Sequence, residues 1–154
     1  MAKKNKKISS YGLQLLKSFE GCRLKAYWDV NGYSIGYGHH SADITKDMSI
    51  TQKVADEFLK KDLAKFEKAV NALKYDFNQN QFDALVDFAY NCGTGNLLKL
   101  TANNTRSIQQ IGYKIPAYCK AGGVKLMGLV KRRNAEQALF TTPCIETEDP
   151  KEDE

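Results

Sequence analysis

Apolar residues recur along the chain at spacings of three to five positions, which predicts a mostly helical protein. A first helix is predicted from Ser9 or Ser10 to about Phe19, because a serine can cap its start and Gly21 can end it. A long helix follows the capping box Ser49–Gln52 and continues for roughly 24 residues with one apolar face. At 1.5 Å per residue it spans roughly 36 Å, which is enough to join two lobes.

Two short strand-like segments lie between these helices, at Leu24–Asp29 and Tyr33–Tyr37. The dipeptide Asn31-Gly32 joins them, and Asn-Gly between such segments is a strong signal for a β-hairpin with a two-residue turn. With this turn, Asp29 faces Ser34 across the strands, and directly opposed residues share one face of a sheet. A carboxylate and a hydroxyl in this arrangement can hold one water molecule between them.

The second half of the chain predicts further helices. The segment Asn78–Gln81 is a second box-like helix start, and the helix that it opens ends at Gly93. Short helices fill residues 97–123, with Gly122-Gly123 closing the last of them, and a final helix covers Leu129–Phe140. The whole pattern predicts an α+β fold that is mostly helical, with a small β-hairpin lobe joined by a long helix to a helical lobe.

Charge is distributed unevenly along the sequence, although the net charge is only +5. Four lysines lie within residues 3–7, whereas six acids and one lysine lie within residues 146–154. We therefore predict a flexible basic segment at 1–9, a folded two-lobe domain at 10–143 and a disordered acidic tail at 144–154. The basic body suits a polyanionic partner such as nucleic acid, an anionic membrane or a bacterial cell wall.

Composition excludes several classes of function. Hydrophobic residues make up 42% and charged residues 27% of the chain, as in soluble globular proteins. No apolar segment approaches the ~20 residues that span a bilayer, and the N-terminus lacks the core of a signal peptide, so we expect no stable membrane insertion. The four cysteines form no CxxC pair and the two histidines are adjacent, so we expect reduced thiols and no metal site.

Two carboxylates carry the candidate chemistry. Glu20 lies at the C-terminal end of the first helix, where the helix dipole disfavours a negative charge, and apolar neighbours such as Phe19 add desolvation. Both effects favour a protonated carboxyl group, as a general acid for glycosidic cleavage requires. Asp29, on a polar hairpin, is expected to stay ionised and to orient the attacking water together with Ser34.

Several segments occur in an order that is specific in combination: Phe19-Glu20-Gly21, Ala26-Tyr27, Ile35–His39, Phe88–Gly93 and Gly128–Glu136. Over about residues 10–140 the chain thereby resembles the phage-type lysozymes, or endolysins, of glycoside hydrolase family 24. The catalytic motif of that family is Glu, eight residues, Asp, five residues and Thr. Glu20 and Asp29 match it, whereas Ser34 replaces the threonine and follows Asp29 after four residues.

The resemblance implies a lysozyme-like fold and a muramidase that cleaves the β-1,4 bond between N-acetylmuramic acid and N-acetylglucosamine of bacterial peptidoglycan. Glu20, Asp29 and Ser34 are the candidate catalytic residues. The candidate substrate-binding residues are Tyr27, His39, Tyr90 and Asn91. The resemblance also implies a monomer without metal or organic cofactor and without a nucleic-acid partner. As a phage endolysin it would accumulate in the host cytoplasm until a holin opens the membrane.

Some interpretations stay open at this point. Because Ser34 and the shortened turn depart from the family motif, a weak or inactive module that binds wall glycan is an alternative. A nucleic-acid binder is a second alternative, disfavoured because the basic segments lack interleaved aromatic residues. For His39 we favour a structural role that fixes the sheet against the long helix. We expect Arg132 and Arg133 to pair with acids, and His40 to lie at the surface.

Overall fold

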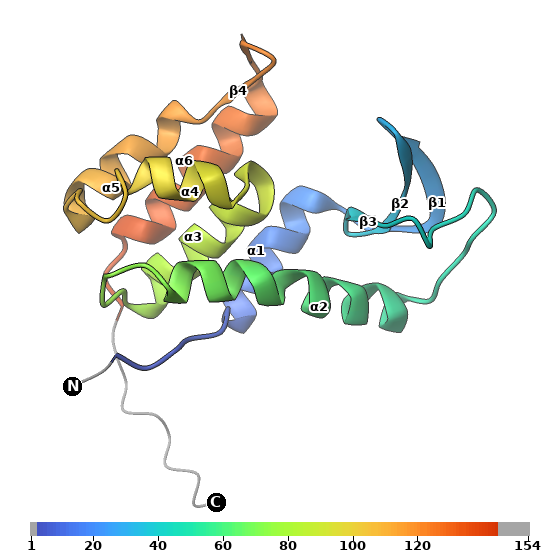
Figure 1. Cartoon of the computed structure of the whole chain (residues 1–154), viewed down its shortest axis with the longest axis horizontal. Coiled ribbons are helices and arrows are strands. Elements are labelled where there is room, and N and C mark those ends of the chain that lie inside the picture. Colours follow the sequence, from blue (N-terminus) through green and yellow to red (C-terminus); the bar gives the residue numbers. More distant parts are fainter. Residues whose placement is uncertain (1–2, 145–154) are drawn as a thin grey trace, which may run out of the picture.

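A computed structural model describes residues 3–144 and confirms the α+β architecture, with helices over most of the chain and two small antiparallel sheets. The elements in chain order are α1 (Ser10–Glu20), β1 (Arg23–Asp29), β2 (Gly32–Gly36), β3 (His39–His40), α2 (Gln52–Asn71), α3 (Gln79–Cys92), α4 (Thr94–Leu100), α5 (Ile108–Lys114), the 3-10 helix η1 (Ile115–Ala117), β4 (Lys120–Ala121), β5 (Val124–Lys125) and α6 (Met127–Thr141). In Figure 1 the β1–β3 sheet forms a small lobe at one end, and α2 extends from beneath it to the helical lobe. Within the described part of the chain, no helix is both long and apolar enough to cross a membrane.

Helix α3 is the centre of the helical lobe. Its start is the predicted capping box, in which Asn78 accepts from the Gln81 backbone N–H and the Gln81 side chain accepts from Asn78 N–H. The helix is buried from Phe82 to Ala89 and packs against α1, α2, α4 and α6. A helix that is apolar on most of its surface must lie inside the fold, so α3 sets the positions of its neighbours.

Helix α1 is attached to α3 at its first turn. Ser9 caps α1 by accepting from Gly12 N–H, as predicted, and also donates its own N–H to Asp83 Oδ1 at 3.0 Å. The Ser9 hydroxyl donates to the other oxygen of Asp83, a residue that is 1% exposed. Burial raises the pKa of Asp83, and its hydrogen bonds with Ser9 and Gln79 oppose that rise. This anchor fixes the direction of α1 and therefore the place of Glu20 at its far end.

Helix α2 begins later and is shorter than predicted, with 20 residues. Thr51 is its N-cap and accepts from Val54 N–H, so the prediction that the box at Ser49 caps this helix is wrong. The physical reason is a tertiary contact, because Ser49 forms an antiparallel bridge with Lys25 of β1. If Ser49 were the N-cap, Ile50 would be the first helical residue, but the N–H of Ile50 donates to Leu24 O of β1 at 2.8 Å and keeps this segment extended.

The β1–β2 hairpin is present, but its register differs from the prediction. Asp29 pairs with Gly32 and Ser34 pairs with Tyr27, so Asp29 and Ser34 are not directly opposed. The turn residues are therefore 30 and 31, and Val30 adopts a left-handed φ of 54°. This φ is rare for a β-branched residue, and the Asn-Gly rule does not anticipate it.

The contact between Gly32 and β3 explains this register. Strand β3 pairs with β2 so that His40 lies opposite Ser34. A Cβ atom at position 32 would lie 3.1 Å from His40 Cε1, which is closer than an ordinary van der Waals contact. Glycine is therefore used inside the strand, where the imidazole approaches the backbone, and not in the turn.

Three further predictions differ from the structure or lie beyond it. Gly122 and Gly123 do not end a helix but form the turn of a second hairpin between β4 and β5, both with positive φ. Residues 3–9, predicted as a flexible segment, lie against α2, where Lys6 and Asn71 exchange two hydrogen bonds of 2.9 Å. Apart from Cys144, the tail predicted at 144–154 lies outside the described residues.

Replacing Gly12 by alanine is expected to destabilise the protein. Alanine normally stabilises a helix interior by up to about 1 kcal/mol relative to glycine, but here the new Cβ would lie 2.6 Å from Asp83 Cγ. We expect a loss of roughly 1–3 kcal/mol, measured as a lower melting temperature.

The matched control is Gly128→Ala in α6, where a new Cβ meets nothing within 4 Å. This variant should melt at the wild-type temperature or above it. If Gly12→Ala stabilised the protein as much as Gly128→Ala, the proposed packing of Asp83 against α1 would be contradicted.

Candidate active site

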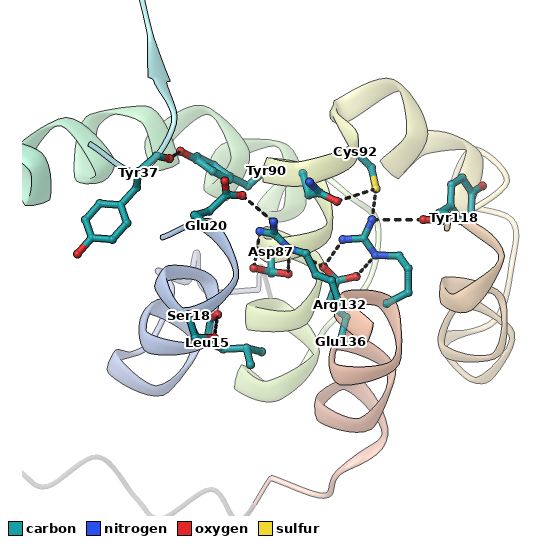
Figure 2. Close-up of polar contacts among 12 residues, drawn as sticks. Leu15, Ser18, Glu20, Tyr37, Asp87, Tyr90, Cys92, Tyr118, Arg132 and Glu136 are labelled. Atoms are coloured by element: carbon teal, nitrogen blue, oxygen red, sulfur yellow. Dashed lines mark hydrogen bonds and ion pairs between the residues drawn. The ribbon is translucent and has the colours of Figure 1, made fainter. Parts of the chain in front are cut away.

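Glu20 is the last residue of α1, and its side chain is 18% exposed. Its Oε2 atom accepts a hydrogen bond of 2.6 Å from Nη1 of Arg132 in α6, which Figure 2 shows as the link between the two helices. The sequence predicted an apolar environment for this carboxyl group. The structure differs, because the partner of Glu20 is a cation supplied by the other end of the chain.

Arg132 is shared between Glu20 and Asp87 of α3. Its Nε and Nη2 atoms donate to the two oxygens of Asp87, both at 2.9 Å, in a bidentate pair (Figure 2). Asp87 is fully buried. Burial opposes the charge of the guanidinium, but the carboxylates of Asp87 and Glu20 outweigh it and raise the pKa of Arg132. The guanidinium therefore joins three helices while it stays charged.

A second buried ion pair lies next to the first. Arg133 donates from Nε and Nη2 to Glu136 at 2.6 and 2.8 Å, and both side chains are fully buried. Burial and the neighbouring Asp87 raise the pKa of Glu136, whereas Arg133 lowers it. The expectation that both arginines pair with acids is confirmed. The cluster thus holds two guanidiniums and three carboxyl groups, with Glu20 at its more exposed edge.

Asp29 is bonded within the small lobe. Ser34 Oγ donates to Asp29 Oδ2 at 3.0 Å, although the two residues are not directly opposed in the hairpin. Ser34 is fully buried, and its Oγ also lies 2.9 Å from Nδ1 of His40. Ser34 therefore contacts the carboxylate directly, whereas the sequence predicted that a water would lie between the two groups.

Two tyrosines lie near Glu20, and one of them, Tyr27, also lies near Asp29. Burial raises the pKa of Tyr27, and the charges of Asp29 and Glu20 add to the effect. Burial also raises the pKa of Tyr90, followed by the charges of Glu20 and Asp62. Tyr27 belongs to the hairpin and Tyr90 to α3, so the fold brings both elements near Glu20 at the end of α1.

Gly38, in the turn between β2 and β3, brings the small lobe against the end of α1. A Cβ atom at this position would lie 3.5 Å from Glu20 Oε1 and 3.9 Å from Tyr90 Oη. Its φ of 86° also favours glycine. The Tyr90 hydroxyl donates to the backbone oxygen of Tyr37 at 2.6 Å (Figure 2). The oxygen of Glu20 that Arg132 leaves free therefore faces this turn.

A comparison with a family model supports the resemblance that the ordered motif indicates. The phage lysozyme family model matches residues 17–136 of the chain. The chain belongs to the phage lysozyme family.

Individual relatives support this membership. The endolysin of Bacillus phage PZA is 44% identical over 144 residues, an alignment that covers 88% of this chain and 55% of the relative. The chain thus spans about half the length of that relative. It is also 38% identical over 143 residues to the endolysin of Acyrthosiphon pisum secondary endosymbiont phage 1, of which it covers 97%, with 86% of this chain aligned.

A solved structure shows the same fold as this phage lysozyme family member. The muramidase domain of SpmX from Asticaccaulis excentricus superposes with a TM-score of 0.79 at 33% sequence identity. The superposition covers 89% of this chain and 99% of that domain. The lysozyme-like architecture predicted from the motif is therefore confirmed at the level of the fold.

The other predicted site residues lie in different environments. His39 Nδ1 is 2.7 Å from Asp62 Oδ2, and its ring stacks on Phe58 at 4.4 Å, so that it holds β3 against α2. Such contacts are expected if His39 fixes the sheet against the long helix, the role favoured from the sequence. Asn91 is exposed and lines a cavity of about 460 Å³ with residues such as Cys92 and Lys120, whereas Glu20 does not line this cavity.

The sequence pattern did not identify Asp87 and His40 as parts of the site. Asp83 and Asp87 are acids four positions apart within the otherwise apolar stretch 82–89 of α3, which is a signal that each needs a buried partner. His40 is exposed as predicted, yet its Nδ1 contacts Ser34. Among residues 3–144, no group of three or more histidine, cysteine or acidic side chains is arranged to hold a metal ion.

Replacing Asp87 by alanine is expected to destabilise the protein by about 3–5 kcal/mol, because it removes the bidentate partner of a buried guanidinium. Urea denaturation would measure this loss. The double variant Asp87→Leu/Arg132→Met should lose less, since it removes both charges of the fully buried pair and leaves only the partly exposed Glu20 without its partner.

The control for this prediction is Asp56→Ala, which removes a solvent-exposed contact of 3.2 Å with Lys17 and should have a small effect. Equal losses in Asp87→Ala and Asp56→Ala would contradict a structural role for the buried pair.

Proposed function

We propose that this chain is a muramidase that hydrolyses the β-1,4 bond between N-acetylmuramic acid and N-acetylglucosamine in bacterial peptidoglycan. The observation that carries the proposal is the pair of motif carboxylates in unlike surroundings. Glu20 is bonded to a buried cation, whereas Asp29 is bonded to a neutral hydroxyl. Two carboxyl groups in different environments are what an acid and a partner carboxylate in glycoside hydrolysis require.

Glu20 is the proposed general acid. Arg132 occupies its Oε2, which leaves Oε1, the oxygen that faces Gly38, to deliver a proton to the leaving oxygen of the sugar. The bidentate pairing with Asp87 consumes much of the positive charge of Arg132. Three carboxyl groups share two guanidiniums here, so Glu20 has no cation to itself. Glu20 is the member of the three that lies nearest to solvent.

Asp29 is the proposed carboxylate that acts on the opposite side of the sugar bond. Its Oδ2 is bonded to Ser34, which leaves Oδ1 to orient an attacking water molecule. In this proposal Ser34 acts by holding Asp29, because the serine is fully buried. Tyr27 and Tyr90, which lie near Glu20, are proposed to contact the substrate. A substrate-binding role for His39 and Asn91 stays a prediction, because His39 bonds to Asp62 and Asn91 lines a cavity that does not include Glu20.

The names of the relatives support this proposed function. Two are endolysins of phages and one is a muramidase domain. We infer that residues 10–143 form the catalytic domain of an endolysin that acts on the cell wall as a monomer. The proposed route to the wall is accumulation in the host cytoplasm and release through a holin.

Glu20→Gln is expected to lower the rate of peptidoglycan hydrolysis by roughly 10²–10⁴-fold, the usual contribution of general acid catalysis, while the fold survives. The assay is mass analysis of the muropeptides released from purified peptidoglycan, which identifies the bond cleaved. Circular dichroism reports the fold.

The control is Glu57→Gln, a matched substitution at an exposed position of α2, which should keep the wild-type rate. Full activity of Glu20→Gln would refute the assignment of the acid. A wild-type protein that binds peptidoglycan but releases no muropeptides would instead favour the binding module left open above.

A further inference from the structure

Three side chains of the small lobe form a chain of hydrogen bonds that the proposed reaction does not fully use. Asp29 Oδ2 lies 3.0 Å from Ser34 Oγ, and Ser34 Oγ lies 2.9 Å from His40 Nδ1. Ser34 is completely buried between its two partners. Strand pairing fixes this order, since Ser34 is opposite His40 in the β2–β3 ladder.

The number of available protons determines which atom donates in each of these two hydrogen bonds. A serine hydroxyl has one proton to donate, and an ionised carboxylate only accepts. Because Ser34 donates to Asp29, it can meet His40 only as an acceptor. The proton between them must therefore belong to Nδ1 of His40, which fixes one tautomer of the neutral ring and leaves Nε2 without a proton.

We propose that His40 is a positioning residue for Asp29 that acts through Ser34, an inference that rests on the proposed function. The Nδ1–H group of His40 holds the Ser34 oxygen, so that the hydroxyl proton points at Oδ2 of Asp29. The carboxylate is then fixed by one oxygen, and Oδ1 is turned toward the position of the attacking water. His40 itself does not touch the substrate in this arrangement.

The replacement of the family's threonine by Ser34 explains why this protein uses the contact between His40 and Ser34. A threonine side chain has a β-methyl group that restrains its rotamer, and Ser34 lacks this group. The bond from His40 supplies the missing restraint by fixing the position of the hydroxyl oxygen. Gly32 belongs to the same device, because a Cβ at that position would lie 3.2 Å from His40 Nε2 and would press on the ring.

The experiment compares turnover of purified peptidoglycan by wild type, His40→Leu and His40→Asn. Leucine removes the donor, and we expect kcat to fall roughly tenfold, as for the loss of one hydrogen bond, with little change in KM. The asparagine amide nitrogen occupies the place of Nδ1, so His40→Asn should recover most of the lost rate. Lys46→Leu, an exposed position in the loop after β3, is the control and should keep the wild-type rate.

A double variant tests whether His40 acts through Ser34. If it does, Ser34→Ala/His40→Leu should be no slower than Ser34→Ala alone, because the single substitution already breaks the chain of bonds. Gly32→Ala adds a variant that removes no polar group, and it should lower kcat by displacing the ring. Wild-type kcat in His40→Leu, or additive losses in the double variant, would overturn the proposal.

A spectroscopic measurement separates this proposal from the proposed function. Nitrogen chemical shifts of the imidazole, measured by NMR, should show Nδ1 protonated and Nε2 unprotonated in the neutral ring of His40, with the preference lost in Ser34→Ala. The opposite tautomer in the wild type would overturn the positioning role whether or not the protein is active. An inactive wild type would contradict the muramidase proposal, while the tautomer would still decide the direction of the hydrogen bonds.

Discussion

The rest of the structure depends on the position of one buried guanidinium. Arg132 of α6 bonds to Glu20, which is 112 positions away in the sequence, and to Asp87 of α3. A buried cation is tolerated when carboxylates surround it, and removing one of them leaves a charge that the interior cannot solvate. The C-terminal end of α1 must therefore meet the interior turns of α3 and α6 at this point. This requirement fixes the position and orientation of Glu20. Glu20 lies beside the turn of the small lobe, which can approach closely because Gly38 has no side chain.

The two motif carboxylates are held by different kinds of bond. Glu20 belongs to an ionic cluster inside the helical lobe, whereas Asp29 belongs to a chain of neutral donors in the sheet, through Ser34 and the proposed donor His40. Helix α2 connects the two lobes, and the contact of His39 with Asp62 fixes the sheet on it. The position of one carboxylate relative to the other thus depends on packing between lobes rather than on the nine positions that separate them in sequence. These different environments are the physical reason why one carboxyl group is proposed to donate a proton and the other to orient the attacking water.

Much of the fold could be predicted because its signals are local. Ser9 and Asn78 cap their helices as the sequence indicated, since a capping side chain bonds to an N–H three residues away. The predicted register of the hairpin was wrong because a turn rule considers two residues, whereas Gly32 is placed in the strand by the imidazole of His40. The same kind of competition moved the start of α2 from Ser49 to Thr51, because Ser49 pairs with a strand.

By itself the sequence determined the helices, the hairpin and the identity of Glu20 and Asp29 as the candidate acid and its partner. Their spacing in a motif and the residue types around them carry that information. Only the tertiary structure decided which groups bond to these carboxylates, namely Arg132 for the first and Ser34, itself in contact with His40, for the second. The reason is that periodicity and capping report interactions within a few residues of the chain. The partners of a buried charge come from segments that meet only when the core is packed.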